Sequence, residues 1–289
     1  MDNTLYPYSP ITERPALTWP GGHRVAFYLG LNIEHYRVDR PSTSIFGGTA
    51  GLSPDPLNYG WRDYGPRVGI WRMISTLDRL GLRASAMVNS DVMTRYPQIV
   101  RAGVERDWAW VAHGQDNSTF EAGLDTGAER AHLRAVVAAI ETATGRRPRG
   151  WLGPALTETY ATPGLLAELG LDYTLDWCCD DQPFALDVDR PRPFLSVPYS
   201  IEVNDVSLFI GKSLSGPDFQ RIVIDQFEQL YADSAHSGRV MALCVHPFIV
   251  NQPFRHRYLE RALEHIVSTS GVWCTTSDDI ARWYLDGVA

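Results

Sequence analysis

Three polar side chains, Asn32, Glu34 and His35, close the apolar run that spans residues 25–35. Four later apolar runs also end in groups able to do chemistry, at Asn89, His113, Asp176 and His246. A carboxylate with two or three histidines can hold a zinc-type cation that activates water. A carboxylate can also act as a base on water, while a separate histidine protonates a leaving nitrogen. Hydrolysis by activated water is the chemistry that this set could perform.

Each of these residues also has a plain structural interpretation. A strand can simply end in side chains that meet water, and a single histidine is more often a hydrogen-bonded structural residue than a ligand. The repetition favours function, because polar groups at the carboxyl ends of parallel strands are where barrels and open α/β folds build active sites.

The elements that must position these groups alternate between short apolar runs and helical patterns. Strands are predicted at residues 25–35, 83–89, 108–112, 149–152, 172–177, 239–245 and 271–276. Helical spacing and end signals predict helices at residues 68–80, 96–106, 125–144, 162–170, 218–232, 255–268 and from 277 onward. Seven strands, each followed by a helix, indicate an α/β barrel in a single domain over residues 1–289.

Two segments interrupt this alternation. Residues 37–66 are rich in Gly, Pro and Ser and show no regular period, so we expect a long loop or lid that borders a pocket or a neighbouring subunit. Residues 193–210 are predicted to form an irregular inserted hairpin.

Composition excludes several function classes. The formal net charge is −8, and Arg146, Arg147 and Arg149 form the only basic cluster, which argues against nucleic acid and anionic membranes as partners. No glycine-rich nucleotide motif follows the first strand. The first residues do not resemble a secretion signal and no apolar run reaches membrane-spanning length, so a cytoplasmic location is expected.

The four cysteines are expected to be reduced and mostly buried, in keeping with that location. Cys244 lies two residues before His246, on the same face of a strand, so it could act as a nucleophile. Packing is the commoner role of a cysteine in an apolar run.

Several long strings resemble the polysaccharide deacetylase superfamily, or NodB homology domain. They include RGWLGPALTETYATPGLLAELG, LDWCCDDQPF and LCVHPFIVNQPFRHRYLERALEHI. The resemblance covers nearly the whole chain and is strongest to the allantoinase-like and cyclic-imide-hydrolase-like branch. It implies a distorted seven-stranded (β/α) barrel, in agreement with the strand count.

The resemblance also implies roles for individual residues. Glu34 stands where the first family motif has its base aspartate, and His35 where that motif has a metal-binding aspartate. His113 matches the first histidine of a metal-binding HxxxH pair, whose second position is Asn117 here. His246 matches the general acid.

Further positions complete the expected site. Asp176 falls in the fourth motif and is a candidate catalytic residue, and Trp151 stands where many members have an arginine next to the base. Together with Asn89 and Trp177, Trp151 is expected to bind substrate.

The resemblance is compatible with a site that holds a metal ion and with a site that works without one. A divalent cation, zinc by preference, would be held by His35, His113 and Asn117, with help from Asp116 or water. Some allantoinase-like relatives work without metal, and Glu34 would then act directly on water.

The predicted function is hydrolysis of a small cyclic amide, imide or ureide. The alternatives are deacetylation of an N-acetylated sugar or polysaccharide, and an inert ligand-binding relative. The resemblance further implies a homo-oligomer, by analogy a tetramer, and a small-molecule substrate.

Overall fold

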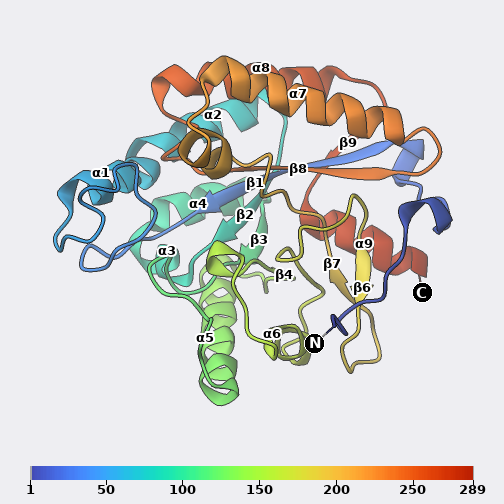
Figure 1. The fold of residues 1–289 in the computed structure, drawn as a ribbon, viewed down its shortest axis with the longest axis horizontal. Coiled ribbons are helices and arrows are strands. Elements are labelled where there is room, and N and C mark those ends of the chain that lie inside the picture. Colours follow the sequence, from blue (N-terminus) through green and yellow to red (C-terminus); the bar gives the residue numbers. More distant parts are fainter. Residues whose placement is uncertain (1, 289) are drawn as a thin grey trace.

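The computed structural model describes residues 2–288, and within them nine strands form one curled sheet with helices packed around it (Figure 1). The order of the first eight strands across the sheet is β6-β7-β5-β4-β3-β2-β1-β8, and β9 pairs with β1. All pairs are parallel except β6 with β7. The predicted α/β barrel-like class is confirmed.

The two longest strands are β1 and β8, and the others are short. Their bounds are β1 Val25–Ile33, β2 Ala84–Val88, β3 Ala109–Ala112, β4 Gly150–Trp151, β5 Tyr173–Thr174, β6 Phe184–Leu186, β7 Phe194–Ser196, β8 Arg239–Val245 and β9 Val272–Thr275. The seven strands predicted from the sequence correspond to β1 to β5, β8 and β9.

Most of the helices follow strands, as a parallel sheet requires. Their bounds are α1 Pro56–Tyr64, α2 Ile70–Leu80, α3 Ser90–Arg95, α4 Pro97–Glu105, α5 Thr126–Thr144, α6 Thr162–Glu168, α7 Gly216–Asp233, α8 Pro253–Ser268 and α9 Ser277–Val288. In Figure 1, α7 and α8 lie side by side along one side of the sheet. No helix within residues 2–288 combines the length and the apolar character that crossing a bilayer would need.

Strand β1 is the axis on which the site is built, because it pairs along its whole length. Its residues 25–31 pair with β8, its residues 25–28 with β9 and its residues 29–33 with β2. Side chains alternate between the two faces of a strand. Ala26 and Tyr28 enter an inner hydrophobic cluster with Val111, whereas Phe27 and Leu29 enter an outer cluster. Continuing this alternation puts Asn32 and Glu34 on the inner face and His35 on the outer face.

The sheet does not close between β7 and β8. A cavity of about 760 Å³ lies on this side, lined in part by Tyr199, Val240 and Ala242. Among the residues that the structure describes, one isolated β-bridge, between Asn204 and Cys244, lies on this side, and the Val240 N–H donates to the Asp181 carbonyl at 2.8 Å. The domain is therefore a curled, partly open barrel.

Two predictions about irregular segments were wrong in part. The expected loop at residues 37–66 ends in helix α1, for which the Asp55 side chain accepts a hydrogen bond from Asn58 N at 3.3 Å. The helical period was hidden because α1 buries polar residues, Asn58 and Arg62. In the expected hairpin at residues 193–210, β7 pairs with the earlier β6, and a π-helical turn occupies residues 206–211.

The cysteines are all free among the described residues, as expected, but only one of the four is buried, and Cys274 is partly exposed. Cys178 and Cys179 are exposed, whereas Cys244 is fully buried. Burial raises the pKa of the Cys244 thiol well above its ordinary value, which opposes a thiolate nucleophile.

Candidate active site

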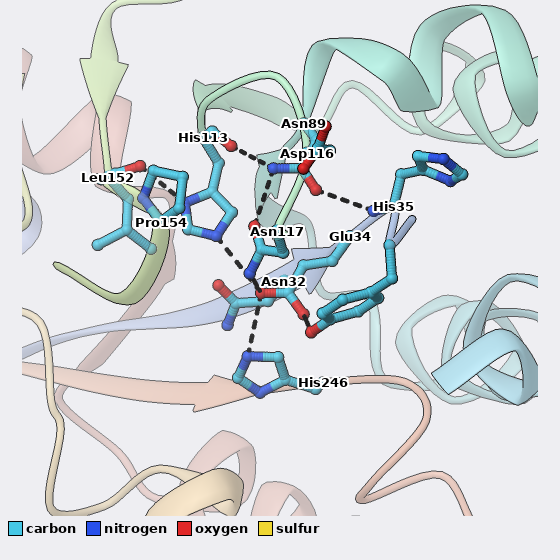
Figure 2. Close-up of polar contacts among 12 residues, drawn as sticks. Asn32, Glu34, His35, Asn89, His113, Asp116, Asn117, Leu152, Pro154 and His246 are labelled. Atoms are coloured by element: carbon cyan, nitrogen blue, oxygen red, sulfur yellow. Dashed lines mark hydrogen bonds and ion pairs between the residues drawn. The ribbon is translucent and has the colours of Figure 1, made fainter. Parts of the chain in front are cut away.

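Glu34 lies at the centre of a buried polar cluster at the carboxyl ends of β1, β3 and β8 (Figure 2). His113 Nε2 is 3.4 Å and His246 Nε2 is 3.5 Å from its Oε1 atom. Asn117 Nδ2 donates to the same oxygen, and Tyr36 donates its hydroxyl to Oε2. The three residues Glu34, His113 and His246, far apart in the sequence, therefore meet at one rim of the sheet.

His246 is held between two carboxylates. On the side away from Glu34, Asp205 accepts a hydrogen bond of 2.7 Å from His246 Nδ1 and another of 2.8 Å from the His246 backbone N–H. Asp205 is fully buried, so its orientation is fixed by this pair of bonds. The arrangement directs His246 Nε2 at Glu34.

The ionisation states of Glu34 and His246 are set by their charged and hydrogen-bonding neighbours in the cluster. Burial alone would lower the pKa of His246, but the negative charges of Glu34 and Asp205 outweigh burial and raise that pKa to about 10. Burial alone would raise the pKa of Glu34, but the charge of His246 and hydrogen bonds from both histidines hold it well below its usual range. At neutral pH, Glu34 is a carboxylate and His246 an imidazolium.

His113 and Asn117 are braced by Asn89, which is fully buried. The Asn89 amide nitrogen donates to the His113 carbonyl and, at 2.9 Å, to Asn117 Oδ1. His113 Nδ1 donates to the Leu152 carbonyl at 2.7 Å, which leaves Nε2 facing Glu34. Asn89 therefore positions the cluster.

The structure does not bring His35 to this cluster. Figure 2 shows its ring turned away from Glu34, and His35 Nδ1 is paired with the Tyr96 hydroxyl at 2.9 Å. The reason is the alternation along β1: consecutive residues point to opposite faces. Only the backbone of His35 serves the cluster, because its N–H donates to Asn89 Oδ1 and its carbonyl accepts from Asn117 N.

The residues present do not fit the zinc site that the resemblance implies. His35 is on the other face, and Asn117 turns its amide nitrogen to Glu34 and its oxygen to Asn89. Asp116 accepts from Ser118 N and lies 3.9 Å from Arg37, so it is engaged elsewhere. Within residues 2–288, no three His, Cys, Asp or Glu side chains are arranged to hold a metal ion. Of the predicted ligand set, His113 alone keeps an atom able to bind a metal ion, Nε2, at the cluster.

Three further predicted site residues, Asp176, Trp151 and Trp177, make contacts outside the Glu34 cluster. Asp176 accepts from Gly153 N at 2.8 Å and from Thr174 Oγ1 at 2.9 Å, and burial raises its pKa to about 7. It thus holds the loop after β4 and does not contact Glu34. Trp151 is fully buried in the outer cluster, and Trp177 packs edge-on against Tyr6 with 5.5 Å between ring centroids.

Sequence reasoning missed two members of the site. Tyr36 could have been found, because residues i and i+2 of an extended segment share a face with Glu34. Asp205 carries no spacing signal, because it belongs to an irregular segment before a π-helical turn.

Comparisons with known proteins agree with this architecture. Residues 61–174 match the polysaccharide deacetylase family model, a stretch that includes His113 but not Glu34 or His246. A Schizosaccharomyces pombe protein classed as a polysaccharide deacetylase is 24% identical over 302 residues, covering 94% of this chain and 93% of that protein.

Two solved structures extend the likeness to the whole fold. The crystal structure of the PuuE allantoinase superposes with a TM-score of 0.87 at 25% identity, covering 96% of this chain and 97% of that one. A Pseudomonas aeruginosa protein classed as a polysaccharide deacetylase superposes with a TM-score of 0.86 at 25% identity, covering 96% and 98%. The chain is therefore similar to proteins of the polysaccharide deacetylase superfamily, over residues 61–174 by the family model and over nearly its whole length by these relatives, and members of that superfamily are hydrolases of carbon–nitrogen bonds other than peptide bonds.

Proposed function

We propose that this protein hydrolyses the carbon–nitrogen bond of a small cyclic amide, imide or ureide, with Glu34 as base and His246 as acid. The observation that carries the proposal is the pairing of these two groups in their working charge states. A base must begin deprotonated and an acid must begin protonated. The pKa of Glu34 is lowered and that of His246 is raised to about 10, so both conditions hold at neutral pH.

The reaction needs two proton transfers. Glu34 takes a proton from water, and the water oxygen attacks the substrate carbonyl carbon. The carbon–nitrogen bond then breaks as His246 Nε2 gives its proton to the leaving nitrogen, and the ring opens to a carboxylic acid. The 3.5 Å contact between Glu34 and His246 is longer than a normal hydrogen bond, so inserting a substrate would break only a weak interaction.

The other residues of the cluster hold these two groups in place. Tyr36 and Asn117 fix the Glu34 carboxylate, and Asp205 fixes the His246 ring and compensates its charge. Asp176 holds the loop that carries the Leu152 carbonyl, the partner of His113. None of these roles uses a metal ion.

Access to the cluster supports a small substrate. Glu34 and His246 are each only 7% exposed and His113 only 2%. A compact ring reaches such recessed groups more easily than a polymer chain does. The similarity to an allantoinase, an enzyme of a cyclic ureide, points in the same direction.

Deacetylation of an N-acetylated sugar is the second candidate. It is supported by the family model over residues 61–174 and by the S. pombe relative. The same base and acid would serve, because an acetamide is also cleaved at a carbonyl carbon bonded to nitrogen.

A panel of substrates tests the proposal. The purified protein would be incubated with succinimide, hydantoin, allantoin and a chitooligosaccharide, with Glu34→Gln as the inactive control. We expect ring opening of at least one cyclic compound. Release of acetate alone would support the deacetylase candidate, and no turnover of any cyclic compound would contradict the proposal.

Two finer expectations from the sequence, a homo-oligomer and a cytoplasmic location, remain predictions, and light scattering and cell fractionation would test them. The zinc expectation is not supported by the donor set, and metal analysis of the purified protein tests it.

A further inference from the structure

One buried polar group inside the site has no role in the reaction as described. Asn32 lies on the inner face of β1, two residues before Glu34, and is only 1% exposed. Figure 2 shows its side chain next to Glu34 and above the His246 ring. It therefore lies beside the contact between the proposed base and acid.

The contacts of Asn32 fix the direction of its amide. Its Nδ2 atom lies 3.3 Å from the Val245 carbonyl and 3.3 Å from the Tyr199 hydroxyl. A backbone carbonyl can only accept a hydrogen bond, so the amide nitrogen must face Val245 and the oxygen must point away from it. Because Val245 immediately precedes His246, this contact also fixes the amide against the strand that carries the acid.

The amide oxygen of Asn32, unlike its nitrogen, faces no hydrogen-bond partner among the described residues. No residue within 2–288 donates a hydrogen bond to Asn32 Oδ1, whereas both amide ends of the neighbouring Asn204 are engaged. An acceptor that no protein group pairs is left for a ligand or water to supply the donor. Asn32 thus presents a free, oriented acceptor to whatever occupies the site.

We propose that Asn32 Oδ1 accepts the N–H of the scissile ring nitrogen, and that Asn32 thereby selects cyclic imides and ureides that carry an N–H over those substituted at nitrogen. This inference rests on the proposed function. The hydrogen bond turns the N–H toward β1 and leaves the nitrogen lone pair facing His246 Nε2, which must protonate it. Asn32 is therefore both a substrate-binding and a specificity-determining residue.

A substituent on the ring nitrogen of the substrate weakens the contact with Asn32 Oδ1 in two ways. A methyl group cannot donate, so Asn32 Oδ1 stays unpaired in the complex, and the methyl carbon occupies the space of the hydrogen bond. The loss of one such bond corresponds to a preference of about tenfold or more for the N–H substrate.

A matched pair of substrates gives the test. The ratio of kcat/KM for succinimide to kcat/KM for N-methylsuccinimide would be measured for the wild type and for Asn32→Ala. We expect the wild type to prefer succinimide by about tenfold or more, and Asn32→Ala to lose most of that preference through a lower kcat/KM for succinimide. An Asn32→Ala variant that is impaired equally on both substrates, with the ratio unchanged, would show a purely structural role and overturn the inference.

Asn204→Ala is the matched control. Asn204 donates to the same Tyr199 hydroxyl, at 3.4 Å, but its oxygen is engaged by Val206 N at 3.0 Å. Its loss loosens the same network without removing a free acceptor, so the substrate ratio should stay at the wild-type value. A ratio that collapses in Asn204→Ala as well would assign the preference to Tyr199 and overturn the inference.

The failure of the proposed function gives a different result. If the wild type opens neither imide, the proposed reaction is wrong and the inference falls with it. If the wild type opens succinimide but the ratio is the same with and without Asn32, the proposed reaction stands and the inference alone fails.

Discussion

Glu34 and His35 are consecutive in the sequence and end on opposite sides of the sheet. Glu34 is contacted on the inner face by His113, His246, Asn117 and Tyr36. The His35 ring is on the outer face with Tyr96 as its hydrogen-bond partner. The pleat of one strand therefore decides which of two adjacent polar residues belongs to the site.

Two of the three histidines predicted to act with Glu34, His246 and His35, differ in the same way. His246 lies between two carboxylates, which raise its pKa to about 10. Burial and the neighbouring Arg95 lower the pKa of His35. The residue type is the same, but at the inner position the neighbouring carboxylates outweigh burial and keep the imidazole protonated, whereas at the outer position they do not.

Turnover should fall most when the proposed base on the inner face, Glu34, is replaced. Glu34→Gln keeps the size of the side chain and removes its basicity, so we expect turnover of the cyclic substrate to fall by about a thousandfold. Circular dichroism would check that the fold is intact. Turnover within a few fold of the wild type would show that the base is another residue.

Loss of the acid should cost less. An imide nitrogen leaves more easily than a simple amide nitrogen, because the second carbonyl stabilises its negative charge. We therefore expect His246→Asn to lower kcat by about a hundredfold on an imide. The deficit should grow with a lactam, whose nitrogen is a poorer leaving group, and an equal deficit on both substrates would contradict the acid role.

Asp205 tests the comparison between His246 and His35, because its negative charge is part of what raises the pKa of His246. The acid works only while His246 is protonated, so kcat/KM of the wild type should be level through neutral pH and fall as the pH rises through about 10. In Asp205→Asn one negative charge is lost and the pKa of His246 decreases. The alkaline fall should then begin at lower pH, with a loss of about tenfold at its plateau. An unchanged pH profile would remove Asp205 from this role.

Turnover should be nearly insensitive to a substitution on the outer face of β1. His35→Phe removes the hydrogen bond to Tyr96 but keeps the backbone contacts to Asn89 and Asn117, so we expect turnover to change by less than about twofold. Activity should also survive exhaustive chelation, because the predicted donors do not converge. A large loss of rate together with loss of a bound metal in His35→Phe would restore the ligand role.

Much of this site could be predicted from the sequence because it depends on regular strands. Glu34, His113 and His246 follow long apolar runs, and parallel strands bring their carboxyl ends to one rim. The same alternation could also have excluded the His35 ring and included Tyr36. The resemblance pointed the other way, because in related sequences the position of His35 holds a metal-binding aspartate.

The rest depends on segments without a period. Asp205 lies in an irregular stretch that bridges the open side of the barrel through Asn204, and nothing in its spacing from His246 predicts their contact. Helix α1 was missed because it buries Asn58 and Arg62, which give no apolar stripe. The fold was predictable from periodicity, whereas the partners that set the charges required the tertiary structure.

The most direct test of the account is the protonation state of His246, followed by NMR with 15N-labelled histidine over a range of pH. We predict that its ring stays doubly protonated through pH 8, loses its proton near pH 10, and titrates at lower pH in Glu34→Gln. A His246 ring that titrates near its ordinary pKa of about 6.5, with no change in Glu34→Gln, would contradict the paired base and acid on which the proposed reaction depends.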